Sequence, residues 1–358
     1  MQRSSLVVLL VFVAFLCACV SGTQQPNTDG ARRKKGPNET VKIGFSMDTL
    51  KEERWQRDKQ LVEQRAREVG AELTVQVANG SDSEQIKQAE NMLTQGVDVL
   101  IVAPHNGDVA ASIVEAAHRQ GVPVISYDRL IKNSDVDLYI SHQVVKMGEM
   151  QAQYLLDHVG KKPANFIIVG GSPTDNNALL LHQGQMNVLQ PAVDRGDVKI
   201  VTDQYAREWQ AEAALNIVEN ALTRVNNQVD AVVCSNDGTA RGAIQALEGQ
   251  NLAGKVLVSG QDADLASIRL IADGKQTMTI YKSIQPLAFG AVAAALKLAR
   301  GEQVATSETI DNGFKKVPAI LLEPVAVDRN NILDTVVKDG YHKLEAICEG
   351  LPADRCPR

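Results

Sequence analysis

The sequence predicts an α/β protein built from two doubly wound lobes. From Val41 onward, short apolar runs of strand length alternate with longer stretches of helical period, which is the pattern of repeated βα units with right-handed crossovers. The runs fall into two consecutive series, so two sheets are favoured over one sheet of ten or more strands. A chain of 358 residues with 44% hydrophobic residues can bury two such cores.

The first series contains buried parallel strands separated by amphipathic helices. Its expected strands are 41–47, 72–78, 97–104, 122–128 and 138–142. Between the second and third, Glu84–Gln95 places four apolar side chains on one helical face. Gly70, Gly96 and Gly121 each follow a helical stretch and precede a strand, as C-terminal helix caps do.

The second series repeats this arrangement further along the chain. Its expected strands are 164–171, 198–204, 230–237, 255–262 and 276–282. Ligands of open α/β sheets meet the loops at the carboxyl ends of the strands. The residues directly after each apolar run are therefore the candidates for a binding site.

Those strand ends are unusually polar. They carry Asp48, Asn106, Asp128, Arg129, Asp175, Asn176, Asn177, Asn236, Asp237, Asp262 and Lys282, with Arg54, Trp55 and Trp209 nearby in sequence. Carboxylates, amides and guanidinium groups can bond adjacent hydroxyls, and indole faces pack on the apolar face of a sugar ring. Each Asp or Asn taken alone also fits a turn or a helix N-cap. Together they favour a site for a neutral polyol.

Other classes of site lack their signatures. The segment after the first strand, SMDTLKEERW, has neither a G-x-G-x-x-G nor a Walker loop, and no G-x-S-x-G, H-E-x-x-H or Cys-x-x-Cys occurs. Gly170 and Gly171 could cradle an anion, but a Gly pair more often relieves backbone crowding. The net charge of −6 is dispersed along the chain, which argues against nucleic-acid binding. We therefore expect no enzyme activity, metal or cofactor, although an enzyme with an unrecognised site stays an alternative.

The first residues have the composition of an export signal. Arg3 precedes an apolar stretch, Leu6–Leu16, that is too short to span a bilayer comfortably. The sequence Leu16 to Cys19 resembles a bacterial lipobox, so we expect a lipoprotein signal peptide over 1–19 and lipidation of Cys19. An ordinary signal peptide is the alternative. Residues 20–40 lack apolar periodicity and predict a flexible tether. The leader and the lipidated cysteine together predict an exported protein in the periplasm or cell envelope, anchored to a membrane.

The remaining cysteines divide into two kinds. Cys234 lies in an apolar run and is expected to be a buried thiol. Cys348 and Cys356 flank a Gly-Pro segment in the tail, 346–358, and could form a local disulfide in an exported protein. A disordered tail is the alternative.

Several long motifs resemble a known family. They are ERWQRD (53–58), ENMLTQGVDVLIVAPHNG (90–107), YDRLI (127–131), GGSPTDNN (170–177), SND (235–237), SGQDADLASI (259–268) and TMTIYK (277–282). From Val41 to Lys343 the chain is similar to the periplasmic sugar-binding proteins of the ribose/galactose type. The resemblance implies a type I periplasmic binding fold, in which two Rossmann-like lobes are joined by three crossover strands. We place the crossings near Val144, Ile284 and Asn312, which gives an N-terminal lobe of 41–144 plus 285–312 and a C-terminal lobe of 145–284 plus 313–345.

The same resemblance implies the ligand, the partners and the site. The expected ligand is a monosaccharide, D-xylose or a related pentose, bound by hinge closure in a monomer that delivers it to an ABC permease of the inner membrane. A sugar sensor for a signalling partner would use the same residues and stays open. The implied ligand-binding residues are Arg54, Trp55, Asp128, Arg129, Asp175, Asn177, Trp209, Asn236, Asp262 and Lys282, with the two tryptophans stacking on the sugar ring.

Overall fold

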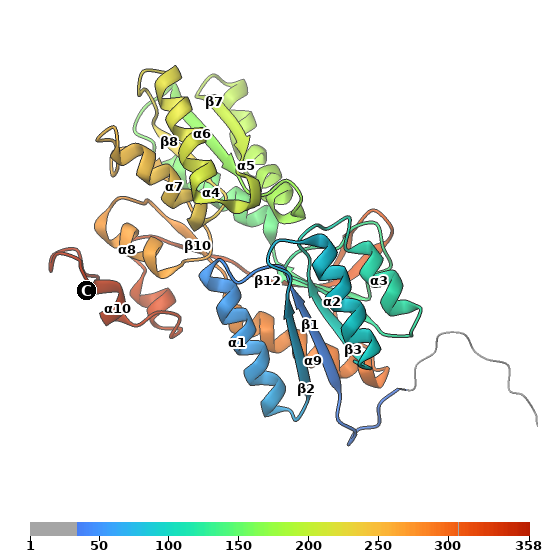
Figure 1. Cartoon of the computed structure of the whole chain (residues 1–358). Helices are drawn as coiled ribbons and strands as arrows, with labels where there is room; N and C mark the ends of the chain where they lie inside the picture. The colour runs from blue at the N-terminus through green and yellow to red at the C-terminus, as the bar shows by residue number, and fades with distance from the viewer. Residues whose placement is uncertain (1–33, 307) are drawn as a thin grey trace, which may run out of the picture.

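The computed structural model describes residues 34–306 and 308–358, which form two lobes with a sheet in each (Figure 1). The predicted signal peptide, Cys19 and residues 20–33 of the predicted tether lie outside the described residues. Residues 34–40 do not behave as a free tether, because the Lys35 N–H donates to the carbonyl of Ala299 at 3.0 Å and its ammonium group lies 3.2 Å from Asp98. No helix in the described part of the chain is both long and apolar enough to cross a bilayer.

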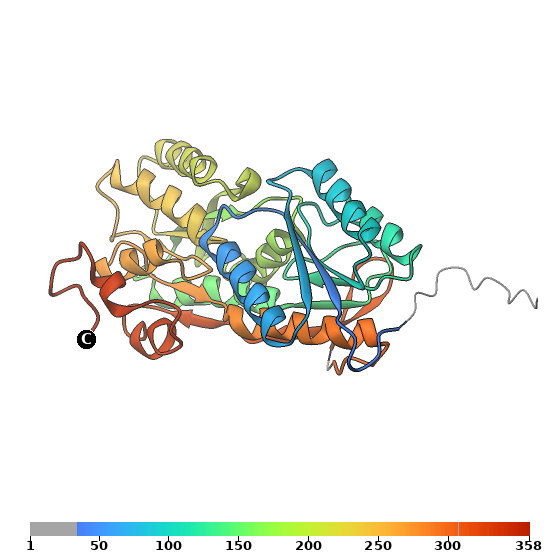
Figure 2. The ribbon, with the colours of Figure 1, turned by 60° about the horizontal axis from the view of Figure 1, so that its bottom comes forward.

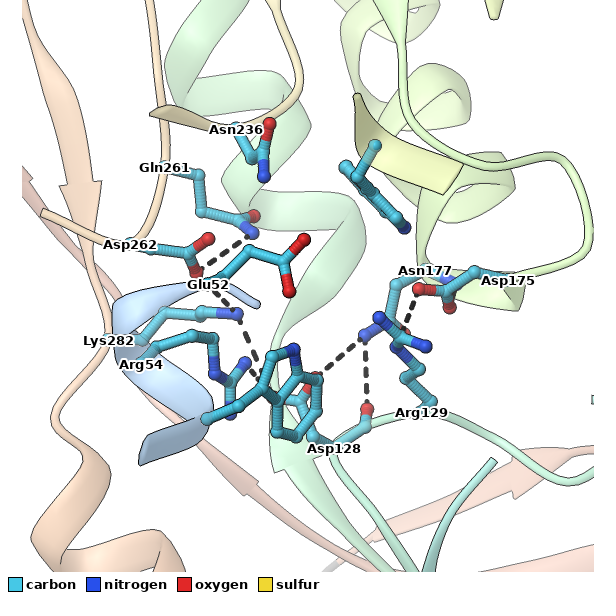
Figure 3. Close-up of a pocket in the computed structure, with 12 residues that line it drawn as sticks. Glu52, Arg54, Asp128, Arg129, Asp175, Asn177, Asn236, Gln261, Asp262 and Lys282 are labelled. Carbon is cyan, nitrogen blue, oxygen red and sulfur yellow. Dashed lines mark hydrogen bonds and ion pairs between the residues drawn. The ribbon is translucent and has the colours of Figure 1, made fainter. Parts of the chain in front are cut away.

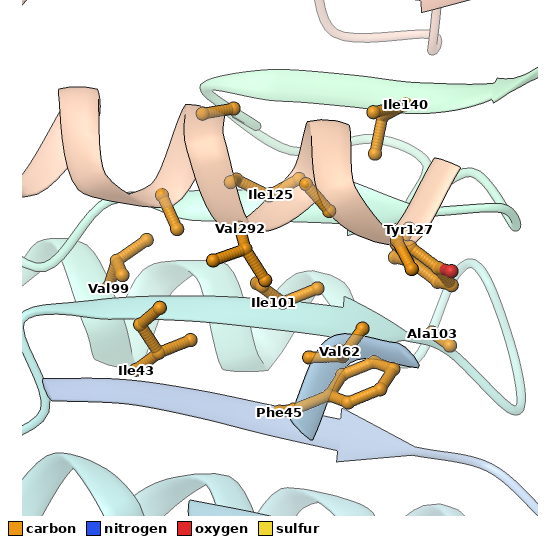
Figure 4. Packing of buried hydrophobic residues seen from close by; sticks show 14 of the residues in the cluster. Ile43, Phe45, Val62, Val99, Ile101, Ala103, Ile125, Tyr127, Ile140 and Val292 are labelled. Atoms are coloured by element: carbon orange, nitrogen blue, oxygen red, sulfur yellow. The ribbon is translucent and has the colours of Figure 1, made fainter. Parts of the chain in front are cut away.

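The first lobe is a seven-stranded sheet of order β11-β12-β5-β4-β3-β1-β2, with α1 and α9 on one face and α2 and α3 on the other. The strands are β1 (Lys42–Met47), β2 (Glu72–Val77), β3 (Val99–Ala103), β4 (Val124–Tyr127), β5 (Leu138–His142), β11 (Glu308–Asp311) and β12 (Lys316–Leu322). The helices are α1 (Glu53–Glu68), α2 (Asp82–Thr94), α3 (Ala111–His118) and α9 (Ile284–Arg300). Figure 4 shows how Phe45 and Ile101 of the sheet pack with Val62 of α1 and Val292 of α9.

The second lobe repeats this arrangement around a smaller parallel sheet of order β7-β6-β8-β9. The strands are β6 (Ala164–Gly170), β7 (Val198–Tyr205), β8 (Ala231–Cys234) and β9 (Leu257–Val258), with β10 (Thr279–Tyr281) and β13 (Val325–Val327) as a separate antiparallel pair. The helices are α4 (Val144–His158), α5 (Asn176–Asp194), α6 (Ala211–Arg224), α7 (Asp237–Glu248) and α8 (Leu265–Asp273). Alternate residues of β6 explain the layers: Phe166 and Ile168 face the α4 and α5 side, and Ile167 and Val169 face α6 and α7.

The chain passes three times between the lobes, and two passages lie where the sequence placed them. The first joins β5 to α4 at Val144, and the second joins β10 to α9 at Ile284. The expected third crossing near Asn312 is wrong. Asn312 lies in the turn between β11 and β12, and β12 pairs with β5 in the first lobe, Ile320 opposite Ile140. Residues 313–322 therefore belong to the first lobe, and the chain crosses between β12 and β13 (Figure 2).

The C-terminal tail is folded against the second lobe. Helix α10 (Leu344–Cys348) spans the expected boundary at residues 345 and 346, and Ile347 is fully buried beside Ile268 and Ile271 of α8. Cys348 and Cys356 form a disulfide, which confirms that alternative over a disordered tail. Cys234 is a buried free thiol, as expected.

Removing this disulfide is expected to destabilise the protein moderately. The two cysteines are 8 positions apart, and in the chain-entropy model closing so short a loop contributes about 2–3 kcal/mol to the free energy of unfolding. The Cys348→Ser/Cys356→Ser double variant should lose about that amount in urea denaturation, and wild-type protein unfolded under reducing conditions should match it. Equal free energies of unfolding for the variant and the oxidised wild type would show that the disulfide does not stabilise the folded protein.

Candidate functional site

A polar cavity lies between the two lobes at the carboxyl ends of their strands. About 330 Å³ of space, part of it open to solvent, lies between its lining residues. Twelve residues line it (Figure 3): Glu52, Arg54, Trp55, Asp128, Arg129, Asp175, Asn177, Trp209, Asn236, Gln261, Asp262 and Lys282. All ten residues predicted for ligand binding are among them, so the structure brings the predicted set together. Glu52 and Gln261 were not predicted.

The local fold explains how residues so far apart in sequence reach one cavity. Arg54 and Trp55 lie in the first turn of α1, which follows β1, and Asp128 follows β4. In the second lobe the site residues begin α5 and α7 or follow β9 and β10, and Trp209 lies in a 3₁₀ turn after β7. Asn236 also caps α7, because its Oδ1 accepts the Thr239 N–H at 2.9 Å. Each lobe thus presents helix N-termini and strand ends to the other.

Three of these residues have left-handed backbone conformations. The φ angles are +59° at Asp128, +57° at Trp209 and +100° at Asp262, values that cost energy in residues with a side chain and concentrate at functional sites. The two aspartates are held alike: the Asp128 N–H donates to Ile140 and the Asp262 N–H to Ile280, both at 2.8 Å. The fold therefore fixes a carboxylate at equivalent places in the two lobes.

Arg54 is buried and lies between two carboxylates. Its Nη1 donates to Asp128 Oδ2 at 2.7 Å, and its Nη2 donates to Asp58 Oδ2 at 2.9 Å. On the other side, the ammonium group of Lys282 lies 3.0 Å from Asp262 and 3.7 Å from Asp128. Burial would raise the pKa of Asp128, but the charges of Arg54 and Lys282 outweigh it and hold that pKa well below its usual range. Asp128 is therefore ionised and fully paired.

Arg129 connects the lobes in a similar way. Its Nη1 donates to Asp48 Oδ2 at 2.7 Å in the first lobe, and its Nε lies 2.8 Å from Asp175 Oδ2 in the second. Burial would raise the pKa of Asp48, yet the hydrogen bond from His105 and the charge of Arg129 lower it. Asp48, which directly follows β1, thus positions Arg129 from outside the cavity.

Three further polar residues at strand ends also lie outside the cavity. Asn106 accepts the N–H groups of Asp108 and Val109 at 3.0 and 3.2 Å, so it forms a turn. Asp237 is buried and accepts the Asp264 N–H at 2.9 Å, which supports the loop that carries Asp262. Asn176 begins α5 without lining the cavity.

The two indole rings are fixed by their neighbours. The Trp55 ring has the guanidinium carbons of Arg54 and Arg129 at 4.1 and 5.1 Å from its centroid, within the range of cation–π attraction. Trp209 packs directly on Gly171, where an added Cβ would lie 2.2 Å from the ring. The Gly170–Gly171 pair therefore relieves crowding, as the sequence suggested, and leaves room for Trp209.

Four buried polar atoms of the lining have no hydrogen-bond partner among the described residues. They are Glu52 Oε2, Asn177 Oδ1, Gln261 Oε1 and Trp209 Nε1, three of which can accept a hydrogen bond and one of which can donate. Buried polar groups are almost always bonded in proteins, so such atoms around one cavity indicate a ligand with several polar groups. Because the lining cations already have carboxylate partners, the site favours an uncharged ligand. No His, Cys, Asp and Glu cluster suited to a metal occurs in the described residues.

Two Rossmann-like lobes joined by three crossings around a polar cavity define a periplasmic binding protein of type I. The sequence pattern of the periplasmic binding protein domain matches residues 43–303, and the chain belongs to this family. The resemblance noted in the sequence is thereby confirmed.

Particular relatives are similar over most of their length. The chain is 51% identical to the D-xylose-binding periplasmic protein of Haemophilus influenzae over 308 residues, 86% of this chain and 92% of the relative. It is also 51% identical to the protein of that name from Escherichia coli K12, over 85% of this chain and 91% of the relative. Among solved structures, a carbohydrate transporter solute binding protein from Chloroflexus aurantiacus in complex with D-glucose superposes with a TM-score of 0.82 at 31% identity, covering 86% of this chain and 98% of that one.

Proposed function

We propose that this protein is the substrate-binding component of an ABC sugar importer and that it binds D-xylose in the cavity between its lobes. The observation that carries the proposal is the set of unpartnered acceptors and an indole donor in a small cavity whose lining cations are already paired. The two relatives at 51% identity are named for D-xylose binding. The ten predicted residues are proposed as the ligand contacts, with Trp55 and Trp209 against the apolar faces of the sugar.

Binding is proposed to close the hinge. Groups of the two lobes already meet around the cavity: Arg129 with Asp175 at 2.8 Å, and Asn177 Nδ2, which donates to the Asp128 carbonyl at 3.1 Å. A ligand that touches both lobes has a higher affinity for the closed form and shifts the population toward it. The closed form is then what the permease recognises.

Export and membrane anchoring complete the proposal. They rest on the leader sequence with Cys19 as the lipidated residue, and the protein is proposed to work as a monomer in the periplasm and not as an enzyme. A sensor role would use the same cavity, because presenting a bound sugar to a signalling partner needs the same closure. Capture of a permease by the sugar-loaded protein would support transport, and capture of a chemoreceptor would support sensing.

D-xylose is expected to raise the melting temperature of the mature protein, and D-ribose and D-galactose much less. A ligand at 100 times its Kd stabilises the folded state by about 2.7 kcal/mol, which corresponds to a shift of several degrees for a protein of this size. Calorimetric titration against the same three sugars gives the affinities directly. Equal shifts with all three would contradict the choice of D-xylose, and no shift with any would contradict the sugar-binding proposal itself.

A further inference from the structure

Glu52, which the sequence did not single out, lies on a boundary between two cavities. It lines the interlobe cavity together with the ten predicted residues, and it also lines an outer cavity of about 460 Å³ that includes Lys51, His105 and Glu208. Only Arg129 and Trp209 line both cavities with it. Figure 3 shows the Glu52 carboxyl group directed into the space that the labelled residues surround.

Arg129 and Trp209 are fixed by protein contacts, whereas the Glu52 carboxyl group keeps one oxygen without a partner among the described residues. Arg129 is held by Asp48 and Asp175, and the Trp209 ring rests on Gly171. Glu52 Oε2 is buried and has no hydrogen-bond partner among the described residues. Of these three side chains, only Glu52 has an unpartnered atom that can accept a hydrogen bond from a ligand.

The other carboxylates of the lining each have a cation. Asp128 pairs with Arg54, Asp175 with Arg129 and Asp262 with Lys282. Burial raises the pKa of Glu52, and the nearby charge of Arg129 opposes this only in part. An unsatisfied buried acceptor destabilises the protein until something bonds it. Glu52 Oε2 therefore destabilises the sugar-free protein, and a hydrogen bond from a ligand hydroxyl would remove this destabilisation.

We propose that Glu52 is a specificity-determining residue whose carboxyl group accepts a hydrogen bond from one hydroxyl of the bound sugar at the boundary of the two cavities. The inference rests on the proposed function, because it needs a polyol in the interlobe cavity. It adds a contact that selects sugars with a hydroxyl at that one ring position.

Replacing Glu52 with leucine should weaken D-xylose binding while leaving the sugar-free protein at least as stable. The expected loss of affinity is about tenfold, the value for one hydrogen bond to a charged group. The melting temperature without sugar should stay level or rise, because an unsatisfied buried carboxyl group has been removed. Glu208→Gln is the matched control: Glu208 lines only the outer cavity and is exposed, so its Kd should stay within about twofold of the wild type.

A cycle with singly deoxygenated D-xyloses identifies the hydroxyl. For one of them, the wild type should bind the analogue about tenfold more weakly than D-xylose. Glu52→Leu should bind the same analogue less than about twofold more weakly than D-xylose, since the carboxyl partner of that hydroxyl is already gone. Additive losses for every analogue, or an unchanged Kd for D-xylose in Glu52→Leu, would overturn the inference. A wild-type protein that binds no sugar at all would instead contradict the proposed function, so the two failures are distinguishable.

Discussion

Replacing Asp128 with alanine is expected to lower the free energy of unfolding by about 3–5 kcal/mol, the range for breaking a buried ion pair. Asp128 accepts from Arg54 at 2.7 Å, and Lys282 lies 3.7 Å away. Without it, Arg54 keeps only Asp58 and Lys282 only Asp262 as carboxylate partners, so the buried ion-pair network is broken. The left-handed φ of +59° remains as a further strain for alanine. Sugar binding should be lost as well, because the carboxylate is a proposed contact.

Urea denaturation of three variants tests this. Asp128→Ala should show the full loss, and Asp128→Asn, which keeps the shape but not the charge, an intermediate one. Glu63→Ala is the matched control, because it removes a surface partner of Lys59 whose ammonium lies 3.2 Å away, and exposed pairs contribute at most about 1 kcal/mol. If Asp128→Ala lost no more stability than Glu63→Ala, the ion pairs of Asp128 would not stabilise the fold as we expect.

Much of the fold could be predicted from the sequence because its core strands are short, continuous apolar runs. The expected strand 41–47 corresponds to β1, and the expected strand 138–142 coincides with β5. The third crossing was misplaced because residues 316–322 form a strand of the first lobe, and local pattern does not show which sheet a strand joins. Its partner β5 lies far back in the sequence, so the pairing depends on tertiary contacts that local pattern does not contain.

The loop after β9 shows a second limit of pattern. The run 255–262 reads as one strand, yet only Leu257–Val258 pairs in the sheet. A Cβ at Gly260 would lie 2.0 Å from Asp237 Oδ1, so the chain turns there against a buried carboxylate and carries Asp262 into the cavity. Side-chain packing from α7, which sequence periodicity does not reveal, ends the strand early.

The site was predictable to the extent that its residues follow strands. Asp128 and Asp262 stand directly after apolar runs, and that position is a physical signal. Gln261 had the same signal, since it precedes Asp262 in the same loop. Glu52 had no such signal in the sequence. It lies in the charged run Lys51–Arg54 at the start of α1, where an acidic residue ordinarily stabilises the helix N-terminus.

The ion pairs and the unpartnered atoms have separate roles in this site. Arg54 and Lys282 pair with carboxylates of their own lobes, Asp128 and Asp262, and fix their positions before a ligand arrives, so less ordering remains to be done on binding. Because these charges are already satisfied, discrimination falls to the unpartnered amide and carboxyl oxygens and to the aromatic surfaces. Among the latter, Trp209 is the group whose removal should cost the most affinity.

Trp209→Ala is therefore expected to weaken D-xylose binding by at least about a hundredfold, or about 2.7 kcal/mol, as is typical of a buried tryptophan at the centre of a binding site. The variant loses a stacking surface and the Nε1 donor that no described residue uses. Because Trp209 lies at the cavity in a short 3₁₀ turn, the far-UV circular dichroism of the protein should not change. Calorimetric titration gives the affinity.

Two further substitutions separate stacking from general disturbance of this segment. Gly171→Ala should reproduce most of the loss with Trp209 still present, because the added methyl group would lie 2.2 Å from the ring and push it out of position. Tyr205→Leu is the control, since Tyr205 precedes the turn and packs on Gly170 outside the cavity. It should bind D-xylose within about threefold of the wild type. Near-normal affinity in Trp209→Ala, or an equal loss in Tyr205→Leu, would mean that the sugar does not stack on this ring.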